Sequence, residues 1–113
     1  MSTDKTANKH DFILPALSVI YLRNAINNPV WASQLDDWVN GCDTLRIVPK
    51  ITIPRQFTQD EDIFKWADEN IISFTLSDKE RDVCRIALRK VFDNKGLPIN
   101  EYATLLISTF SLK

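Results

Sequence analysis

Three arginines recur every four residues in the stretch SDKERDVCRIALRKVFD, at positions 81, 85 and 89. If the stretch is helical, this spacing places them in one row along a flank of the helix. Like charges at that separation repel each other mildly, and a guanidinium offers paired donors to carboxylates and phosphates. The row of Arg81, Arg85 and Arg89 is therefore a candidate for binding an anion or forming charge pairs with a partner. The simpler interpretation is a solvated helix face, partly neutralised by neighbouring aspartates.

The last predicted helix, in PINEYATLLISTF, carries apolar side chains on two sides. Its broad apolar face is expected to enter the core, whereas an outer side holds leucines among uncharged serines and threonines. Depletion of charge is typical of the centre of a protein interface. On the predicted helix 78–94, Ile86 points away from the apolar stripe. On the predicted helix 59–70, Trp66 borders an acidic patch. The predicted partner interface therefore comprises Leu105, Leu112, Ile86 and Trp66, and the alternative is a second core contact or singly exposed residues.

The stretch from 75 to 102 also invites comparison with a DNA-reading helix-turn-helix. Its second helix has no Arg or Lys in its body and carries Glu101 near its start, so it suits a polyanion poorly. The net charge of the chain is only −1. The leading hypothesis is a non-catalytic protein-binding factor, such as a small regulator, inhibitor or assembly subunit, or a homo-oligomer. The alternative is a nucleic-acid-associated protein that binds phosphates through the arginine row.

Groups for catalysis or metal binding are scarce. The one histidine, His10, lies in the predicted tail, and two glycines cannot form a phosphate-binding loop. Cys42 and Cys84 are too few for a structural zinc site and are expected to be reduced thiols of a cytoplasmic protein, although the sequence does not tell whether they meet. We therefore predict no enzyme activity, no cofactor and no metal. The apolar run at 12–22 is too short to span a membrane.

The sequence predicts a flexible polar tail over 1–10 and a single globular domain over 11–113. The fold class is α+β and mostly helical, with about five helices and a small two-stranded edge sheet, in the order α-α-β-α-β-α-α. Capping boxes are expected where Thr58 and Ser77 precede a glutamate by three residues. The predicted helices cover about 12–28, 29–40, 59–70, 78–94 and 98–110, and the strands cover 44–53 and 71–76, paired with each other.

Overall fold

The computed structural model describes residues 9–27, 46–94 and 100–112. Over these residues it contains four helices and one two-stranded antiparallel sheet. The predicted mixture of helices with a small sheet is confirmed, but the order is wrong at its start, and the predicted helix over 29–40 lies outside the described residues. The elements are β1 (Lys9–Pro15), α2 (Ala16–Ile26), α5 (Asp60–Glu69), β2 (Ile71–Ser77), α6 (Asp78–Asp93) and α7 (Glu101–Thr109).

Residues 9–15 form a strand, where the sequence predicted the end of a polar tail and the start of a helix. Phe12 and Leu14 are buried while Ile13 between them is 70% exposed, which is the alternation of a half-buried strand. Pro15 explains the difference, because the residue before a proline disfavours the helical conformation. The prediction failed because apolar residues on both faces of the strand concealed the alternation.

The predicted strand near 71–76 is confirmed as β2, but its partner differs from the predicted one. It pairs antiparallel with β1, and Phe12 lies opposite Phe74 in the register. The two strands have the same pattern of burial, so their buried side chains share one face of the sheet. The chain therefore builds its sheet from two segments that are far apart in sequence.

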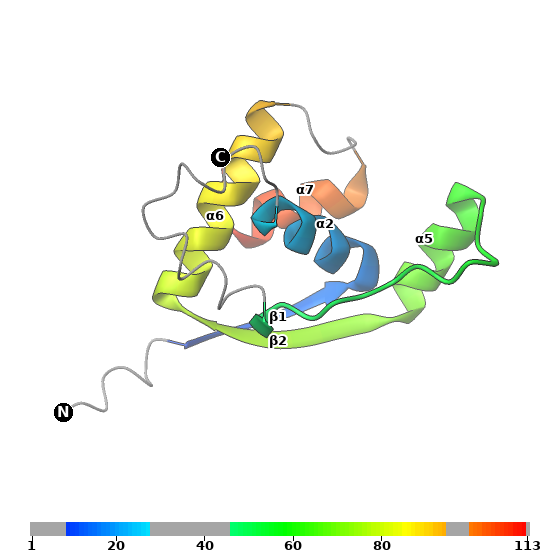
Figure 1. Ribbon diagram of the computed structural model, residues 1–113, viewed down its shortest axis with the longest axis horizontal. Helices are drawn as coiled ribbons and strands as arrows, with labels where there is room; N and C mark the ends of the chain where they lie inside the picture. The colour runs from blue at the N-terminus through cyan, green and yellow to red at the C-terminus, as the bar shows by residue number, and fades with distance from the viewer. Residues whose placement is uncertain (1–8, 28–45, 95–99, 113) are drawn as a thin grey trace.

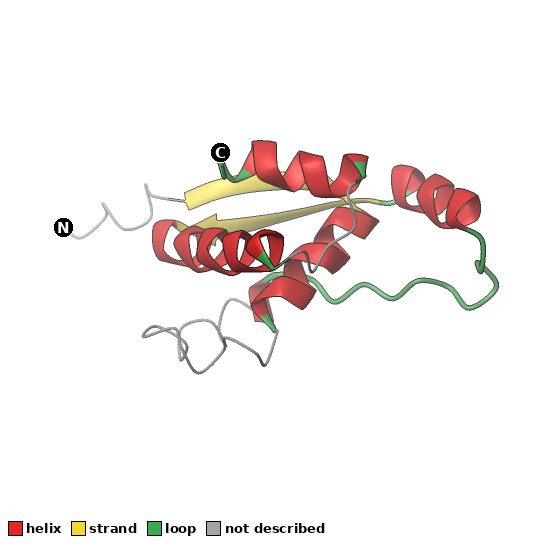
Figure 2. Cartoon of the chain, turned by 90° about the horizontal axis from the view of Figure 1, so that it is seen from above, coloured by secondary structure: helices red, strands yellow, loops and turns green. Residues whose placement is uncertain are grey.

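The segment predicted as a strand over 44–53 contains no strand in its described part, from 46 onward. It continues as an extended loop toward α5 (Figure 2). Ile51 and Ile53 are partly buried against the core, whereas Thr52 between them is exposed. The alternation therefore matches burial over 51–53, but Val48, at a position predicted to face outward, is buried in the main core, and no strand pairs with this segment.

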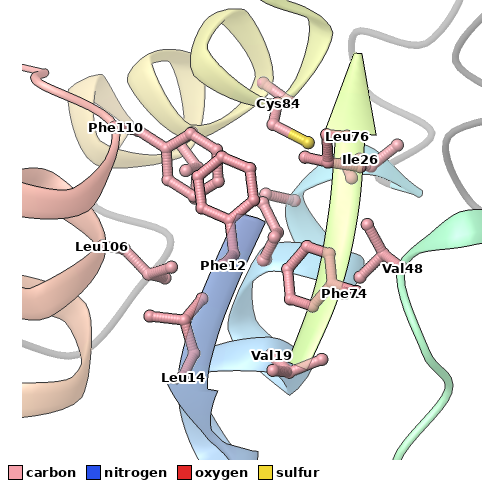
Figure 3. Close-up of a cluster of buried hydrophobic side chains, with 14 of the residues drawn as sticks. Phe12, Leu14, Val19, Ile26, Val48, Phe74, Leu76, Cys84, Leu106 and Phe110 are labelled. Carbon is pink, nitrogen blue, oxygen red and sulfur yellow. The ribbon is translucent and has the colours of Figure 1, made fainter. Parts of the chain in front are cut away.

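Helices α2, α6 and α7 gather on one face of the sheet, and α5 lies beyond the end where β2 begins (Figure 1). Helix α2 is central, because it contacts both strands and the other three helices. In the main core Phe12 stacks between Phe74 and Phe110, with ring centroids 5.5 Å and 4.9 Å away (Figure 3). A smaller buried cluster joins α2, α5 and α7 through Ala16, Leu17, Ala67 and Tyr102.

Local capping signals explain where some of these helices begin. Ser77 and Glu80 form the predicted capping box at α6, with both reciprocal hydrogen bonds present. The predicted box at Thr58 does not form, since α5 begins after Gln59 without a side-chain cap. The acidic first turn of α5 favours that end of the helix electrostatically. None of the described helices is both long enough and apolar enough to cross a membrane.

Candidate functional site

The arginine row runs along α6, and two of its members bind the end of α7. The Nε of Arg85 donates to the carbonyl oxygen of Phe110 at 3.0 Å, and an Nη of Arg89 donates to that of Leu112 at 3.4 Å. Carbonyl groups at the end of a helix lack helical partners and carry partial negative charge. Arg85 therefore binds the C-cap carbonyl of α7 and Arg89 binds a carbonyl in the turn that follows it, which gives this part of the row a structural role.

The chain leaves α7 through a Schellman motif. The amide of Leu112 donates to Ile107 at 3.0 Å and that of Ser111 to Ser108 at 3.3 Å. Ser111 has a φ of 54°, in the left-handed region that glycine adopts most readily. Because the helix ends at Thr109, Leu112 no longer follows helical spacing. It packs partly buried against the main core instead of lying on the outer side of the helix as predicted.

Arg81 differs from the other two arginines of the row. Its Nε is the one buried side-chain nitrogen or oxygen among the described residues that has no hydrogen-bond partner. Arg81 and Arg85 line a pocket of about 160 Å³, whose other described walls are the residues 109–111 that follow α7. The carboxylate of Asp82 lies 3.8 Å from an Nη of Arg85. The positive charge at this pocket is therefore only partly neutralised.

A larger groove of about 520 Å³ follows the exposed side of α6. Ile86 is the apolar residue of its described lining and is 46% exposed. Charged side chains of both signs surround it. An apolar centre within a polar rim resembles the anatomy of a protein interface. The charged residues that line the groove are Asp82, Arg85, Arg89, Lys90 and Asp93.

The other predicted interface residues do not join this groove. Leu105 is 36% exposed on α7. Trp66 is partly buried and packs against the smaller cluster, whereas Leu112 packs against the main core. None of the three is among the described residues that line the groove around Ile86. The structure thus places Ile86 beside the arginine row and distributes the remaining predicted residues elsewhere.

Among the described residues, the most exposed large apolar side chains lie on a surface that the sequence analysis missed. Ile13 is 70% exposed and Ile71 is 53% exposed, both on the sheet face that points away from the helices. A hollow of about 370 Å³ on this sheet is lined by residues 11–13 and 73–75. Pro15 was the available signal, because a strand ending at that proline would have turned Ile13 outward.

The titratable side chains of the described residues are held in packed or hydrogen-bonded positions. Burial raises the pKa of the Cys84 thiol, so it stays protonated at neutral pH and is a poor nucleophile. Burial, followed by a hydrogen bond to Asp68, raises the pKa of Tyr102. His10 pairs with Asp78 at the start of α6. Within the described ranges, no three His, Cys, Asp or Glu residues converge in a way that could hold a metal ion.

Comparisons of the chain with models of protein families, with curated proteins and with solved structures found no match. No relative therefore supplies a substrate, ligand or partner. What the chain binds has to be inferred from the chemistry of its own surface.

Proposed function

We propose that the chain is a non-catalytic protein-binding factor, a small regulator, inhibitor or assembly subunit that covers a partner surface with the exposed side of α6. The observation that carries this proposal is Ile86, an exposed apolar side chain inside a groove with a charged rim. Burial of such a centre supplies affinity, because apolar surface leaves water. The rim supplies orientation and selects the partner by charge complementarity.

The composition of the rim favours a protein partner over a polyanion. Three cationic side chains and two carboxylates line the groove, which gives a net charge of +1 (3 − 2). The carboxylates of Asp82 and Asp93 would repel a phosphate backbone but can pair with basic residues of a protein. Arg85 and Arg89 can meet acidic residues on the same partner, because arginine forms well-directed pairs with carboxylates.

The test uses the full-length protein and two isoleucine variants. Tagged wild type is used to capture partners from an extract of the cells that express it, and each captured protein is purified and titrated calorimetrically. Ile86→Glu is expected to weaken the Kd by at least about 30-fold, since it places a charge at the interface centre. Ile13→Glu is the matched control, because Ile13 is also exposed but lies on the sheet.

The two variants separate the possible results. Binding that fails with Ile13→Glu and survives Ile86→Glu would contradict the assignment to α6 and place the interface on the outer sheet face. Light scattering on the same samples addresses self-association: a wild-type dimer that Ile86→Glu converts to a folded monomer would identify the partner as a second copy of the chain.

Phosphate binding by the arginine row remains the alternative proposal, with weaker support. Helix α7 itself carries no basic residue and has Glu101 in its first turn. Nucleic-acid binding would weaken steeply with added salt and would be lost in Arg85→Glu, whereas burial of Ile86 is expected to tolerate moderate salt.

A further inference from the structure

The pocket between α6 and the end of α7 carries a charge that the described residues do not balance. Arg81 and Arg85 contribute +2, and Asp82 beside Arg85 contributes −1, so the pocket has a net charge of +1 (2 − 1). No ion pair joins Arg81 to an acidic residue of the described chain. Two adjacent guanidinium groups repel each other, and an anion placed between them removes that repulsion.

The buried Nε of Arg81 is a second and independent sign that this site takes a ligand. Buried polar atoms nearly always have hydrogen-bond partners, and an exception calls for a ligand, an ion or a water molecule. Arg81 is also one of the residues that line the pocket of about 160 Å³. An anion in the pocket would lie against the same guanidinium that now lacks a partner.

The surroundings favour a monoanion over a phosphate. The pocket lies at the C-terminal end of α7, where the helix dipole contributes about half a negative charge. The Nε of Arg85 is already occupied by the carbonyl oxygen of Phe110. A carboxylate needs the paired N–H donors of one guanidinium group, which Arg81 supplies. It also needs one positive charge to balance its own, which the net charge of the pocket supplies.

We infer that the Arg81–Arg85 pocket binds a carboxylate, supplied by an Asp or Glu side chain of the partner protein. This inference rests on the proposed function, because Arg85 lines both the pocket and the groove around Ile86. A partner that buries Ile86 would then place an acidic residue beside its apolar contact. The carboxylate would fix the direction in which the partner lies along α6.

The test is an NMR titration of the full-length protein with sodium acetate, with sodium chloride added to hold the ionic strength constant. Wild type is expected to show saturable shifts of the Nε–Hε signals of Arg81 and Arg85 and of the amides of residues 109–111. Arg81→Gln is expected to weaken acetate binding at least about tenfold. Arg55→Gln is the matched control, because Arg55 is exposed and lies outside the pocket.

Several results would overturn the inference. These are wild-type shifts no larger than with chloride alone, equal shifts in Arg81→Gln, or inorganic phosphate binding about tenfold tighter than acetate, which would indicate a phosphoryl ligand. If Arg81→Gln folds poorly, the location of the wild-type shifts decides: shifts at Arg55 as large as those at Arg81 contradict a specific site.

The failure of this inference and that of the proposed function are distinguishable. Ile86→Glu is expected to weaken partner binding by at least about 30-fold and to leave acetate binding intact, because Ile86 does not line the pocket. Loss of partner binding in Ile86→Glu, with no acetate binding in wild type, would contradict the carboxylate pocket alone. Acetate binding in wild type, with full partner affinity in Ile86→Glu, would contradict the groove as the interface.

Discussion

The two ends of helix α7 are held by different chemistry. At its N-terminal end, the Asn100 side chain accepts hydrogen bonds from the amides of Tyr102 and Ala103, both at 3.0 Å. The same side chain donates to the hydroxyl of Tyr21 at 2.9 Å. The hydroxyl of Ser18, which is fully buried, donates to the carbonyl oxygen of Tyr102 at 3.0 Å. These are contacts between neutral groups; the Ser18 hydrogen bond is buried and the other three are partly buried.

The C-terminal end relies on the Phe110 ring and on charged groups nearer the solvent. Phe110 is buried on Phe12, while the guanidinium groups of Arg85 and Arg89 hold the carbonyls beyond the last turn. Neutral buried hydrogen bonds are insensitive to salt, whereas contacts of exposed charges are screened. The end of α7 that adjoins the proposed carboxylate pocket is therefore the end that can respond to an anion.

The largest effect is expected when the apolar anchor of the C-terminal end is removed. Phe110 is 1% exposed and stacks on Phe12, so Phe110→Ala should destabilise the protein by about 3–5 kcal/mol in urea unfolding followed by circular dichroism. Leu105→Ala on the same helix should cost about 0.5 kcal/mol or less. Similar costs for the two variants would show that Leu105 belongs to the core.

Alkaline pH is expected to destabilise the fold through two buried groups. The pKa values of Cys84 and Tyr102 are raised above their ordinary values of 9.0 and 10.0, mainly by burial, so the native state holds these protons more tightly than the unfolded state. Their stabilising contribution is complete below the ordinary values and declines above them. Each group should remove about 1.4 kcal/mol per pH unit beyond its ordinary value.

The Tyr102→Phe variant tests whether Tyr102, in the first turn of α7, contributes to the loss of stability at alkaline pH. At neutral pH it should cost about 1 kcal/mol, because the single proton of the Tyr102 hydroxyl lies between two acceptors, an oxygen of Asp68 at 2.8 Å and the Phe64 carbonyl at 3.1 Å. Above pH 10 its stability should fall less steeply than that of wild type, since one titrating group is gone. An unchanged slope would assign the alkaline loss to groups other than Tyr102.

The sequence predicted well those elements whose signals are local. The capping box at Ser77 and Glu80 defined the start of α6, and the acidic first turn defined that of α5. Pairing between strands depends on distant residues, so periodicity at 44–53 could not tell that β2 would pair with 9–15 instead. An apolar run interrupted by Pro15 fits both a helix start and a strand end. Tertiary packing decided between the two.

The candidate site was predictable only where it depends on local helix geometry. The four-residue spacing of the arginines and the outward direction of Ile86 follow from helical geometry alone. The use of Arg85 and Arg89 by the end of α7 does not, because it depends on how two helices meet. Helical spacing predicts Leu112 on the outer side, because nothing in the sequence indicates that Ser111 adopts the left-handed conformation that glycine prefers.

A glycine at position 111 should strengthen the C-terminal end of α7. Ser111 has a φ of 54°, which costs a residue with a Cβ atom about 1 kcal/mol relative to glycine. Ser111→Gly is therefore expected to raise the free energy of unfolding by up to about 1 kcal/mol. In urea unfolding the midpoint should rise while the m-value, the slope of this free energy against urea concentration, stays unchanged. Ser108→Gly is the matched control, since a glycine inside the helix should destabilise by a similar amount. A loss of stability in Ser111→Gly would contradict the turn described here.

The smallest expected effect tests most directly whether the two ends of α7 differ in their sensitivity to salt. Arg85→Gln removes the donor to the Phe110 carbonyl and should cost about 0.5 kcal/mol at low salt, because the group is partly exposed. The cost should shrink at about 1 M NaCl, where charges are screened beyond about 3 Å. Ser18→Ala, which removes a neutral buried hydrogen bond at the opposite end, should cost about 1 kcal/mol at either salt concentration. If salt reduced both costs alike, the two ends of α7 would not differ in the way proposed, and the end beside the pocket would have no special sensitivity to anions.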